Sequence, residues 1–261
     1  MSHLLDCGRT GDHLPLPEVI DMHGHLGWCD FAIPDTTPAG MVAVMDRIGV
    51  RSIVCSHMQC FGPDVIRGNR EVLAAMRAFP GRILGYAAFW PSDEAAVRAE
   101  VEYCLEAGFT GLKVHNSHGF PYTYPPYAPA YQLADERRLP VLLHTWGDEG
   151  VFAEIAELAT RYPNTSILLA HAGSANAESY IRMAREHANV FLDTVHSASP
   201  RGMIERLVAC AGAEKVVWGS DGYFINQSQQ IGKVLGAKIP DEAKVRILSG
   251  NARGILARRI D

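Results

Sequence analysis

The sequence predicts an α/β protein, a single-domain (β/α)8 TIM barrel over residues 1–261 with residues 1–16 as an N-terminal extension. Short, nearly continuous apolar segments recur eight times, and such segments are typical of parallel strands buried on both faces. Segments with helical spacing of apolar residues separate them, and eightfold strand–helix alternation fits a closed barrel of about 250 residues. No change in composition marks a second domain.

The eight predicted strands are PEVIDMH (17–23), RSIVCSH (51–57), RILGYAAFW (82–90), TGLKVHN (110–116), PVLLHTW (140–146), TSILLAH (165–171), NVFLDTV (189–195) and KVVWGSD (215–221). A doubly wound open sheet is the competing fold, but no G-x-G-x-x-G loop follows the first strand. Apolar residues recur with helical spacing in the segments 97–105 and 151–162. We expect helices to start near Asp93 and Pro200 and to end near Gly108 and Gly212.

Composition and charge exclude several classes of function. The chain is 48% hydrophobic with a net charge of −5, so it can bury a large core and lacks the basic surface typical of nucleic-acid-binding proteins. No apolar segment approaches the roughly 20 residues needed to cross a bilayer. The first residues, MSHLLDCGRTGDH, lack the pattern of a signal peptide. We therefore expect a cytoplasmic protein that acts on a small molecule, with no nucleic-acid or membrane partner; the oligomeric state stays open, a homo-oligomer included.

The six cysteines form no C-x-x-C pair, which argues against a zinc knuckle or a disulfide framework. Cys55 and Cys104 lie in apolar patterns and are expected in the core. Cys29 follows a pair of histidines closely and is a minor candidate for a place near a functional site.

Histidines gather where the predicted strands end. In VIDMHGHLGW, His23 and His25 flank one glycine, and alternate residues of an extended chain share a face, so both imidazoles should point the same way. Two neutral imidazoles aimed at one point suit a divalent metal, whereas the alternative is a hydrogen-bonded pair at the start of a loop. Seven of the eleven histidines close a predicted strand or begin the loop after it: His23, His25, His57, His115, His144, His171 and His196.

His144 and His171 interrupt apolar strands, and Asp221 ends the last one. A buried imidazole needs a hydrogen-bond partner or a metal, and a buried carboxylate needs a neutralising partner. Taken singly, each histidine is explained as a core residue with a satisfied hydrogen bond, and Asp221 as the N-cap of the next helix. Because active sites of (β/α)8 barrels lie at the C-terminal ends of the strands, the whole set favours a metal site.

The ordered motifs resemble those of the amidohydrolase superfamily, in particular its amidohydrolase 2 branch, which includes aminocarboxymuconate-semialdehyde decarboxylase. The motifs are DMHGH (21–25), GLKVHN (111–116), PVLLHTWG (140–147), ILLAHAG (167–173), VVWGSD (216–221) and GNARGIL (250–256). The resemblance implies one or two divalent ions, zinc as the first choice and manganese as the second. It implies His23, His25, His144 and Asp221 as metal ligands, with His171 as a ligand of a second ion or as an acid or base. It also implies that Asp221 takes a proton from metal-bound water.

Lys113 of the fourth predicted strand has three interpretations. In two-metal members of the superfamily a lysine on this strand is carboxylated and bridges both ions, which would make Lys113 a metal ligand. Alternatively, its free ammonium binds a substrate carboxylate, or it forms a structural ion pair. His115, two residues on, shares the face of Lys113 and is placed to assist in substrate binding.

Aromatic residues just past the strands would form the walls of the pocket. Trp28, Trp146 and Tyr122 are candidate substrate contacts, and such a wall favours a planar, unsaturated substrate. The segment GFPYTYPPYAPAY (119–131) either covers the mouth of the barrel or packs on its own side chains. Arg201 either pairs with a substrate carboxylate or is a solvated charge at the start of a helix.

The function predicted first is metal-dependent hydrolysis of a small lactone, ester or amide, with Asp221 and His171 as catalytic residues. A metal held by neutral imidazoles and a carboxylate lowers the pKa of its water toward about 7, which makes a nucleophile. The alternative is a metal-dependent decarboxylase of a small unsaturated or aromatic acid, and a third hypothesis is a non-catalytic, ligand-binding barrel. Two ions with carboxylated Lys113 would favour hydrolysis, whereas one ion with His171 free would favour decarboxylation.

Overall fold

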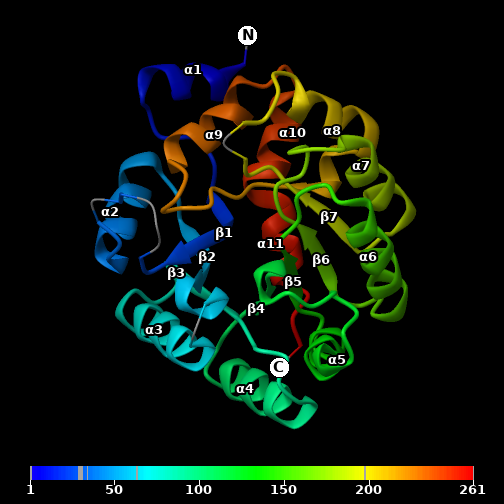
Figure 1. The fold of residues 1–261 in the computed structure, drawn as a ribbon. Helices are drawn as coiled ribbons and strands as arrows, with labels where there is room; N and C mark the ends of the chain where they lie inside the picture. Colours follow the sequence, from blue (N-terminus) through cyan, green and yellow to red (C-terminus); the bar gives the residue numbers. More distant parts are fainter. Residues whose placement is uncertain (1, 29–31, 34, 63, 197, 261) are drawn as a thin grey trace.

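A computed structural model of the chain describes residues 2–28, 32–33, 35–62, 64–196 and 198–260. Eight strands pair in parallel, each with the next one along the chain, and helices surround them (Figure 1). The strands are β1 (Ile20–Leu26), β2 (Ser52–His57), β3 (Ile83–Ala87), β4 (Gly111–Val114), β5 (Pro140–Leu143), β6 (Ser166–Leu169), β7 (Val190–Asp193) and β8 (Val216–Val217). Each lies within one of the eight predicted segments or overlaps it, and the predicted single-domain (β/α)8 barrel is confirmed.

The barrel closes between its first and last strands, because the backbone of β1 bonds to residues that follow β8. The N–H of Met22 donates to the carbonyl of Trp218 at 3.0 Å, and the N–H of Asp221 donates to the carbonyl of His23 at 2.8 Å. Gly24 and Gly222 form a further parallel bridge. This seam places the end of β8 directly beside the histidine pair of β1.

The helices follow the predicted alternation with the strands. Asp93 caps α4 as expected, its side chain accepting the N–H of Ala96, and Gly212 ends α8. The prediction for Pro200 is wrong by three residues, because the chain makes a further turn and α8 starts at Met203 after Gly202, whose φ of +86° suits glycine. The helices are α1 (His3–Thr10), α2 (Pro38–Ile48), α3 (Val65–Ala78), α4 (Glu94–Glu106), α5 (Ala128–Glu136), α6 (Glu149–Arg161), α7 (Ala177–Glu186), α8 (Met203–Ala211), α9 (Gln227–Gly236), α10 (Asp241–Val245) and α11 (Asn251–Leu256).

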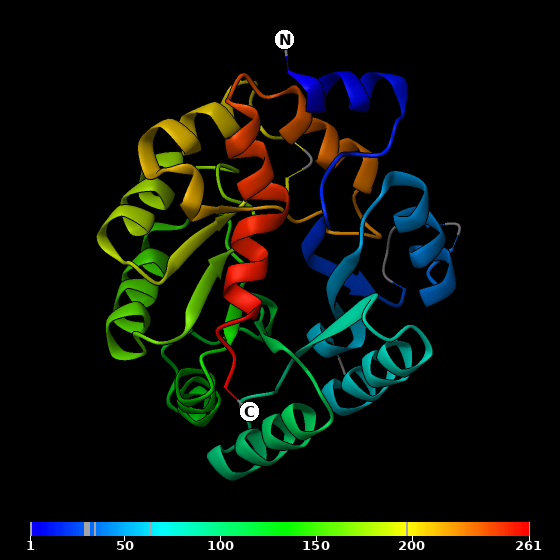
Figure 2. The ribbon, with the colours of Figure 1, turned by 180° about the vertical axis from the view of Figure 1, so that it is seen from behind.

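The C-terminal helical segment covers the end of the barrel where the strands begin. Helix α10 continues through a π-helical turn, Arg246–Gly250, into α11, which crosses this end of the barrel (Figure 2). Asn251 donates to the carbonyls of Ala213 and Val216 at 2.7 Å, just before and at the start of β8. Ala252 and Ile255 complete an apolar cluster with residues in or next to six strands: Ile20, Met22, Val54, Tyr86, Leu142, Leu168, Ala170 and Val217.

Strand β1 carries a register shift, so that side chains before the shift pack in the core and side chains after it lie at the C-terminal end of the barrel. Asp21 pairs with Ile53 but Gly24 pairs with Cys55, so β1 has one residue more than β2 over this stretch, as in a β-bulge. Met22 packs into the apolar cluster, and the histidines beyond the shift face the opposite end. A Cβ at Gly24 would lie 2.4 Å from Cδ1 of Ile53, which explains why glycine separates the histidines.

Several smaller expectations can be checked in the described residues. Cys55 and Cys104 are buried and free, as predicted for core residues, whereas Cys29 lies outside the described residues. In the segment 119–131, Tyr122, Tyr127 and Tyr131 are buried and their neighbours stack on one another, so the segment packs on its own side chains. Across the described part of the chain, no helix combines the length and apolar character needed to cross a membrane.

Candidate metal centre

Three side chains converge at the C-terminal end of the barrel. Nε2 of His23 lies 3.2 Å from Nε2 of His25, and Oδ1 of Asp221 lies 3.5 Å and 3.0 Å from these two nitrogens. Among the described residues these form the one group of three histidine, cysteine or acidic side chains whose ligand atoms all lie within 4.8 Å of one another. We call His23, His25 and Asp221 the metal cluster. Asp221 is not the helix cap that we had weighed, because Asn226 caps α9.

Buried hydrogen-bond partners orient both imidazoles of the metal cluster. Nδ1 of His23 contacts Oδ2 of Asp193 at 2.7 Å, and Nδ1 of His25 contacts the hydroxyl of Ser56 at 3.0 Å. When the outer nitrogen of a histidine donates to such a partner, Nε2 carries the lone pair that a metal binds. Burial lowers the pKa of both His23 and His25, which favours this neutral form.

The donor set fits a divalent ion. Two neutral imidazole nitrogens about 3 Å apart repel each other through their lone pairs unless a cation lies between them. Burial opposes ionisation of Asp221, but its polar contacts, that with His25 first, lower its pKa overall, so it supplies a negative oxygen. A ligand set of imidazole nitrogens and one carboxylate oxygen suits zinc, manganese or iron. Calcium and magnesium prefer ligand sets made of oxygen atoms only.

Lys113 joins the metal cluster from β4. The side chain is 1% exposed, and its Nζ lies 3.1 Å from Nε2 of His23 instead of contacting a carboxylate. Burial lowers the pKa of Lys113 to about 8, so part of the population carries the neutral amine at neutral pH. The structural ion pair is therefore the least supported of the three interpretations of this lysine.

His144 and His171 form a second pair at the ends of β5 and β6. Nδ1 of His171 donates to the carbonyl of Val195 at 3.2 Å, and its Nε2 lies 3.3 Å from Nδ1 of His144. Burial lowers the pKa of His171 to about 4, so the ring is neutral and its Nε2 accepts a hydrogen bond from Nδ1–H of His144. Nε2 of His144 then carries a lone pair, but the structure does not bring this atom into the metal cluster.

Aromatic rings surround both groups of histidines. The indole of Trp146 is half exposed and stacks on His171, with ring centroids 4.5 Å apart and planes 1° apart. His115 packs on His144 at 3.8 Å between ring centroids. Phe61 and Phe224 flank His25 at 5.5 Å and 5.2 Å. The site therefore has flat, apolar walls beside its polar centre.

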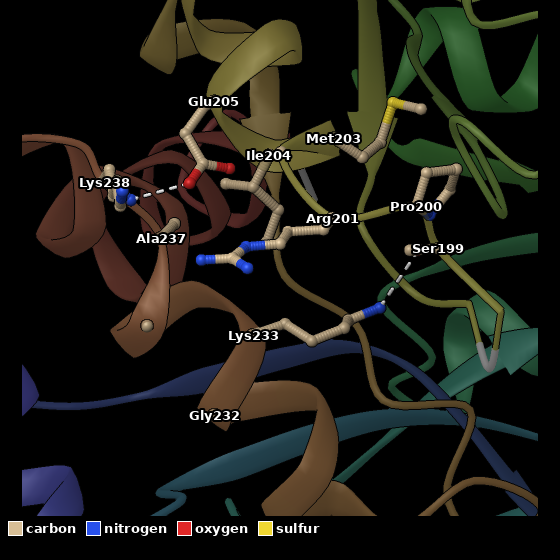
Figure 3. A pocket seen from close by; sticks show the side chains of 12 residues that line it. Ser199, Pro200, Arg201, Met203, Ile204, Glu205, Gly232, Lys233, Ala237 and Lys238 are labelled. Carbon is tan, nitrogen blue, oxygen red and sulfur yellow. Dashed lines mark hydrogen bonds between the residues drawn. The ribbon is translucent and has the colours of Figure 1, made fainter.

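Other candidate substrate contacts lie elsewhere. Tyr122 is buried, and its hydroxyl donates to the backbone carbonyl of His144, so it supports that residue from behind. Trp28 follows β1 and is 69% exposed. Arg201 lines a separate cavity of about 290 Å³ formed by residues 199–205 and by part of α9 and the turn after it. Figure 3 shows its guanidinium between Glu205 and Lys233, and none of the described residues lining this cavity belongs to the metal cluster.

Two of the site residues adopt a backbone conformation that is uncommon outside glycine. His171 has a φ of +59° and Asp221 a φ of +58°. Such left-handed residues cost free energy and concentrate at functional sites, where the surrounding structure holds them. His171 lies in the segment after β6 and Asp221 in the segment after β8, so the strain lies where the polar side chains are presented.

The sequence analysis missed the groups that hold the metal cluster in place. Asp193 ends β7 and would have been found by the same signal as Asp221, an acidic residue that closes an apolar strand. Asp21 is fully buried, accepts the N–H groups of His23 and Ser220 and bonds to Gln227, and burial raises its pKa to about 7. Ser56 carries no comparable signal, because a buried serine in a strand is common.

Comparison with known proteins agrees with this geometry. Residues 20–258 match the profile of the amidohydrolase family. Among solved structures, 2,6-dihydroxybenzoate decarboxylase from Rhizobium is 18% identical with a TM-score of 0.71, covering 92% of this chain and 98% of that one. Dihydroxybenzoic acid decarboxylase from Polaromonas, with bound manganese and the inhibitor 2-nitroresorcinol, is 18% identical with a TM-score of 0.71, covering 92% and 97%. 4-Oxalomesaconate hydratase from Rhodopseudomonas palustris is 16% identical with a TM-score of 0.72, covering 92% and 96%. No curated protein sequence matches this chain.

Fold and site together define a (β/α)8-barrel enzyme with a cluster of side chains that could hold a metal ion at the C-terminal end of its strands. The chain belongs to the amidohydrolase family, which its profile match covers over nearly the whole length. The resemblance noted in the sequence is thereby confirmed.

Proposed function

We propose that this protein is a metal-dependent decarboxylase of a small aromatic or unsaturated carboxylic acid, in preference to the hydrolase predicted first. One observation carries the proposal: the described residues offer one three-ligand cluster, with His171 outside it and occupied with His144. A single ion with a histidine beside it that does not bind the metal is the arrangement that favours decarboxylation. The similar structures named as decarboxylases support the same choice.

The metal cluster would hold one divalent ion, zinc or manganese, through His23, His25 and Asp221, and His144 needs a turn of its ring to join them. When bound, the ion supplies positive charge that holds the substrate carboxylate and withdraws electrons from the adjacent carbon. The flat walls formed by Trp146 and the phenylalanines would orient a planar substrate and exclude water.

Asp221 is the proposed proton carrier. In the reaction, the bond between the carboxylate and the adjacent carbon breaks, carbon dioxide leaves, and the electron pair of that bond takes a proton. Asp221, which is ionised at rest, would take this proton from solvent at the mouth and pass it to the carbon, because the electron pair left on the carbon is far more basic than a carboxylate. His171 is neutral, and if His144 turns toward the metal cluster, Nε2 of His171 would be free to accept a proton from a substrate hydroxyl.

Hydrolysis remains the second candidate because of Lys113. Its amine is buried 3.1 Å from a ligand nitrogen, in the region where a carboxylated lysine would bridge two ions. The alternative role, binding a substrate carboxylate through its ammonium, fits decarboxylation equally well. The state of this side chain therefore separates the two functions.

The test combines turnover with analysis of the purified enzyme. Zinc- or manganese-loaded protein is incubated with a panel of hydroxybenzoates and unsaturated acids, and the release of carbon dioxide and the product are measured. Elemental analysis gives the number of ions per chain, and intact mass detects a carbon dioxide adduct on Lys113. We expect one ion, no adduct and decarboxylation; two ions with an adduct, together with hydrolysis of a lactone or ester, would replace the proposal with the hydrolase.

A further inference from the structure

His196, in the loop after β7, is a buried histidine that the proposed reaction does not use. His196 is 9% exposed. The centroid of its ring lies 5.8 Å from that of Trp146 and 6.3 Å from that of His171, and its plane is roughly perpendicular to both. The ring therefore lies beside the aromatic wall of the site.

Helix α9 fixes the backbone of this residue. The N–H of His196 donates to Oε1 of Gln230 at 3.2 Å, and its carbonyl accepts from Nε2 of Gln230 at 3.4 Å and from Nζ of Lys233 at 2.9 Å. Gln230 is fully buried. A loop residue held by two side chains of a neighbouring helix has little freedom to move when a ligand binds.

The loop also fixes which ring nitrogen carries the proton. Nδ1 of His196 accepts the backbone N–H of Ala198 at 3.0 Å, so Nδ1 is unprotonated and the neutral ring carries its proton on Nε2. Burial and the nearby charge of Lys233 lower the pKa of His196, which favours the neutral ring. Nε2–H lies on the side of the ring away from this contact, and no described residue is its hydrogen-bond partner.

We propose that Nε2–H of His196 donates a hydrogen bond to a second oxygen of the substrate, separate from the carboxylate that the metal holds. The inference rests on the proposed function and narrows its substrate class to planar acids that carry a hydroxyl or oxo group close to the carboxylate. A substrate lying against Trp146 would lie next to the ring of His196, whose centroid is 5.8 Å from that of the indole. A prepositioned donor discriminates between ligands, because a ligand that covers it without offering an acceptor leaves it unpaired.

Two substitutions separate the donor from the fold of the loop. In His196→Asn the side-chain oxygen can still accept the N–H of Ala198, as in an Asx turn, but the Nε2–H donor is lost. In His196→Gln the amide N–H reaches close to the position of Nε2 and keeps a donor there. His118→Asn is the matched control, since His118 is equally buried but bonds to Tyr127 and to the carbonyl of Cys60.

The probes are 2,6-dihydroxybenzoate and benzoate, titrated by calorimetry into manganese-loaded protein. We expect the unchanged chain to bind the dihydroxy acid about tenfold more tightly than benzoate, a difference typical of one good hydrogen bond. His196→Asn should reduce the ratio of the two dissociation constants to near one, whereas His196→Gln and His118→Asn should retain most of it. Metal content and Tm should stay the same in all four proteins.

An equal ratio in the unchanged chain and in His196→Asn, or no preference in the unchanged chain, would overturn the inference. The binding ratio does not depend on turnover. Selective binding without release of carbon dioxide would therefore contradict the proposed function alone, and decarboxylation with an unaltered ratio would contradict the role of His196 alone.

Discussion

The two ends of the barrel carry opposite kinds of side chain. At the C-terminal end, each of His23, His25, Lys113 and Asp221 lies within hydrogen-bonding distance of at least one of the others. At the N-terminal end, α11 covers a cluster that is almost entirely aliphatic and aromatic. The same strands contribute to both, and β1 changes from one role to the other across its register shift.

This difference indicates that stability and chemistry are separated along the barrel axis. Burying apolar surface stabilises the fold, whereas burying ionisable groups costs free energy unless they are paired or bound to a cation. The effect is visible in the pKa values, since burial lowers that of His23 and raises those of Asp21 and Asp193. Substitutions at the two ends should therefore have opposite consequences.

The largest effect is expected from Asp221→Asn at the mouth. The amide keeps the shape of the side chain, and asparagine tolerates a φ of +58° better than alanine does. Loss of the negative ligand oxygen should lower metal retention and reduce turnover by at least about 10³-fold, while the Tm changes by only a few degrees. Elemental analysis, steady-state kinetics and thermal unfolding measure the three quantities. Unchanged turnover in metal-free Asp221→Asn would exclude the proposed mechanism.

The opposite result is expected from Ile255→Ala at the closed end. Ile255 is 3% exposed within the apolar cluster, so truncation leaves a cavity and should lower the free energy of unfolding by about 3 kcal/mol. Metal content and kcat per folded molecule should not change, because none of the metal-cluster residues belongs to this apolar cluster. Denaturant unfolding, with Ile260→Ala as an exposed control, provides the measurement. A drop in metal content would show that the two ends are coupled.

A smaller loss of metal binding should follow from Asp193→Asn. This substitution compares a residue that supports a metal ligand with Asp221, which is itself a proposed ligand. Asp193 binds no metal in this proposal but holds Nδ1 of His23 at 2.7 Å, and loss of such a partner typically weakens metal binding 10- to 100-fold. Competition with a chelator gives the metal affinity, and Asp35→Asn on an exposed loop is the control. An affinity equal to that of the unchanged chain would show that Asp193 serves only the fold.

The local sequence pattern was sufficient to predict the order of strands and helices and part of the candidate site. Strand and helix periodicity act over a few residues, so all eight strands and the cap at Asp93 were predictable. The meeting of His23, His25 and Asp221 was also predictable, because parallel strands of one barrel end at the same rim.

Contacts between residues distant in the chain decided the remainder. The turn of His144 toward His171, the support from Asp193 and Ser56, and the distant place of Arg201 all depend on packing that no short pattern encodes. Periodicity fixes which face of a strand a side chain occupies, but the direction of its last few atoms depends on neighbours from other strands. The amino-acid sequence alone thus determined the barrel fold and the end of the barrel at which the candidate site lies. The tertiary structure determined which atoms meet there.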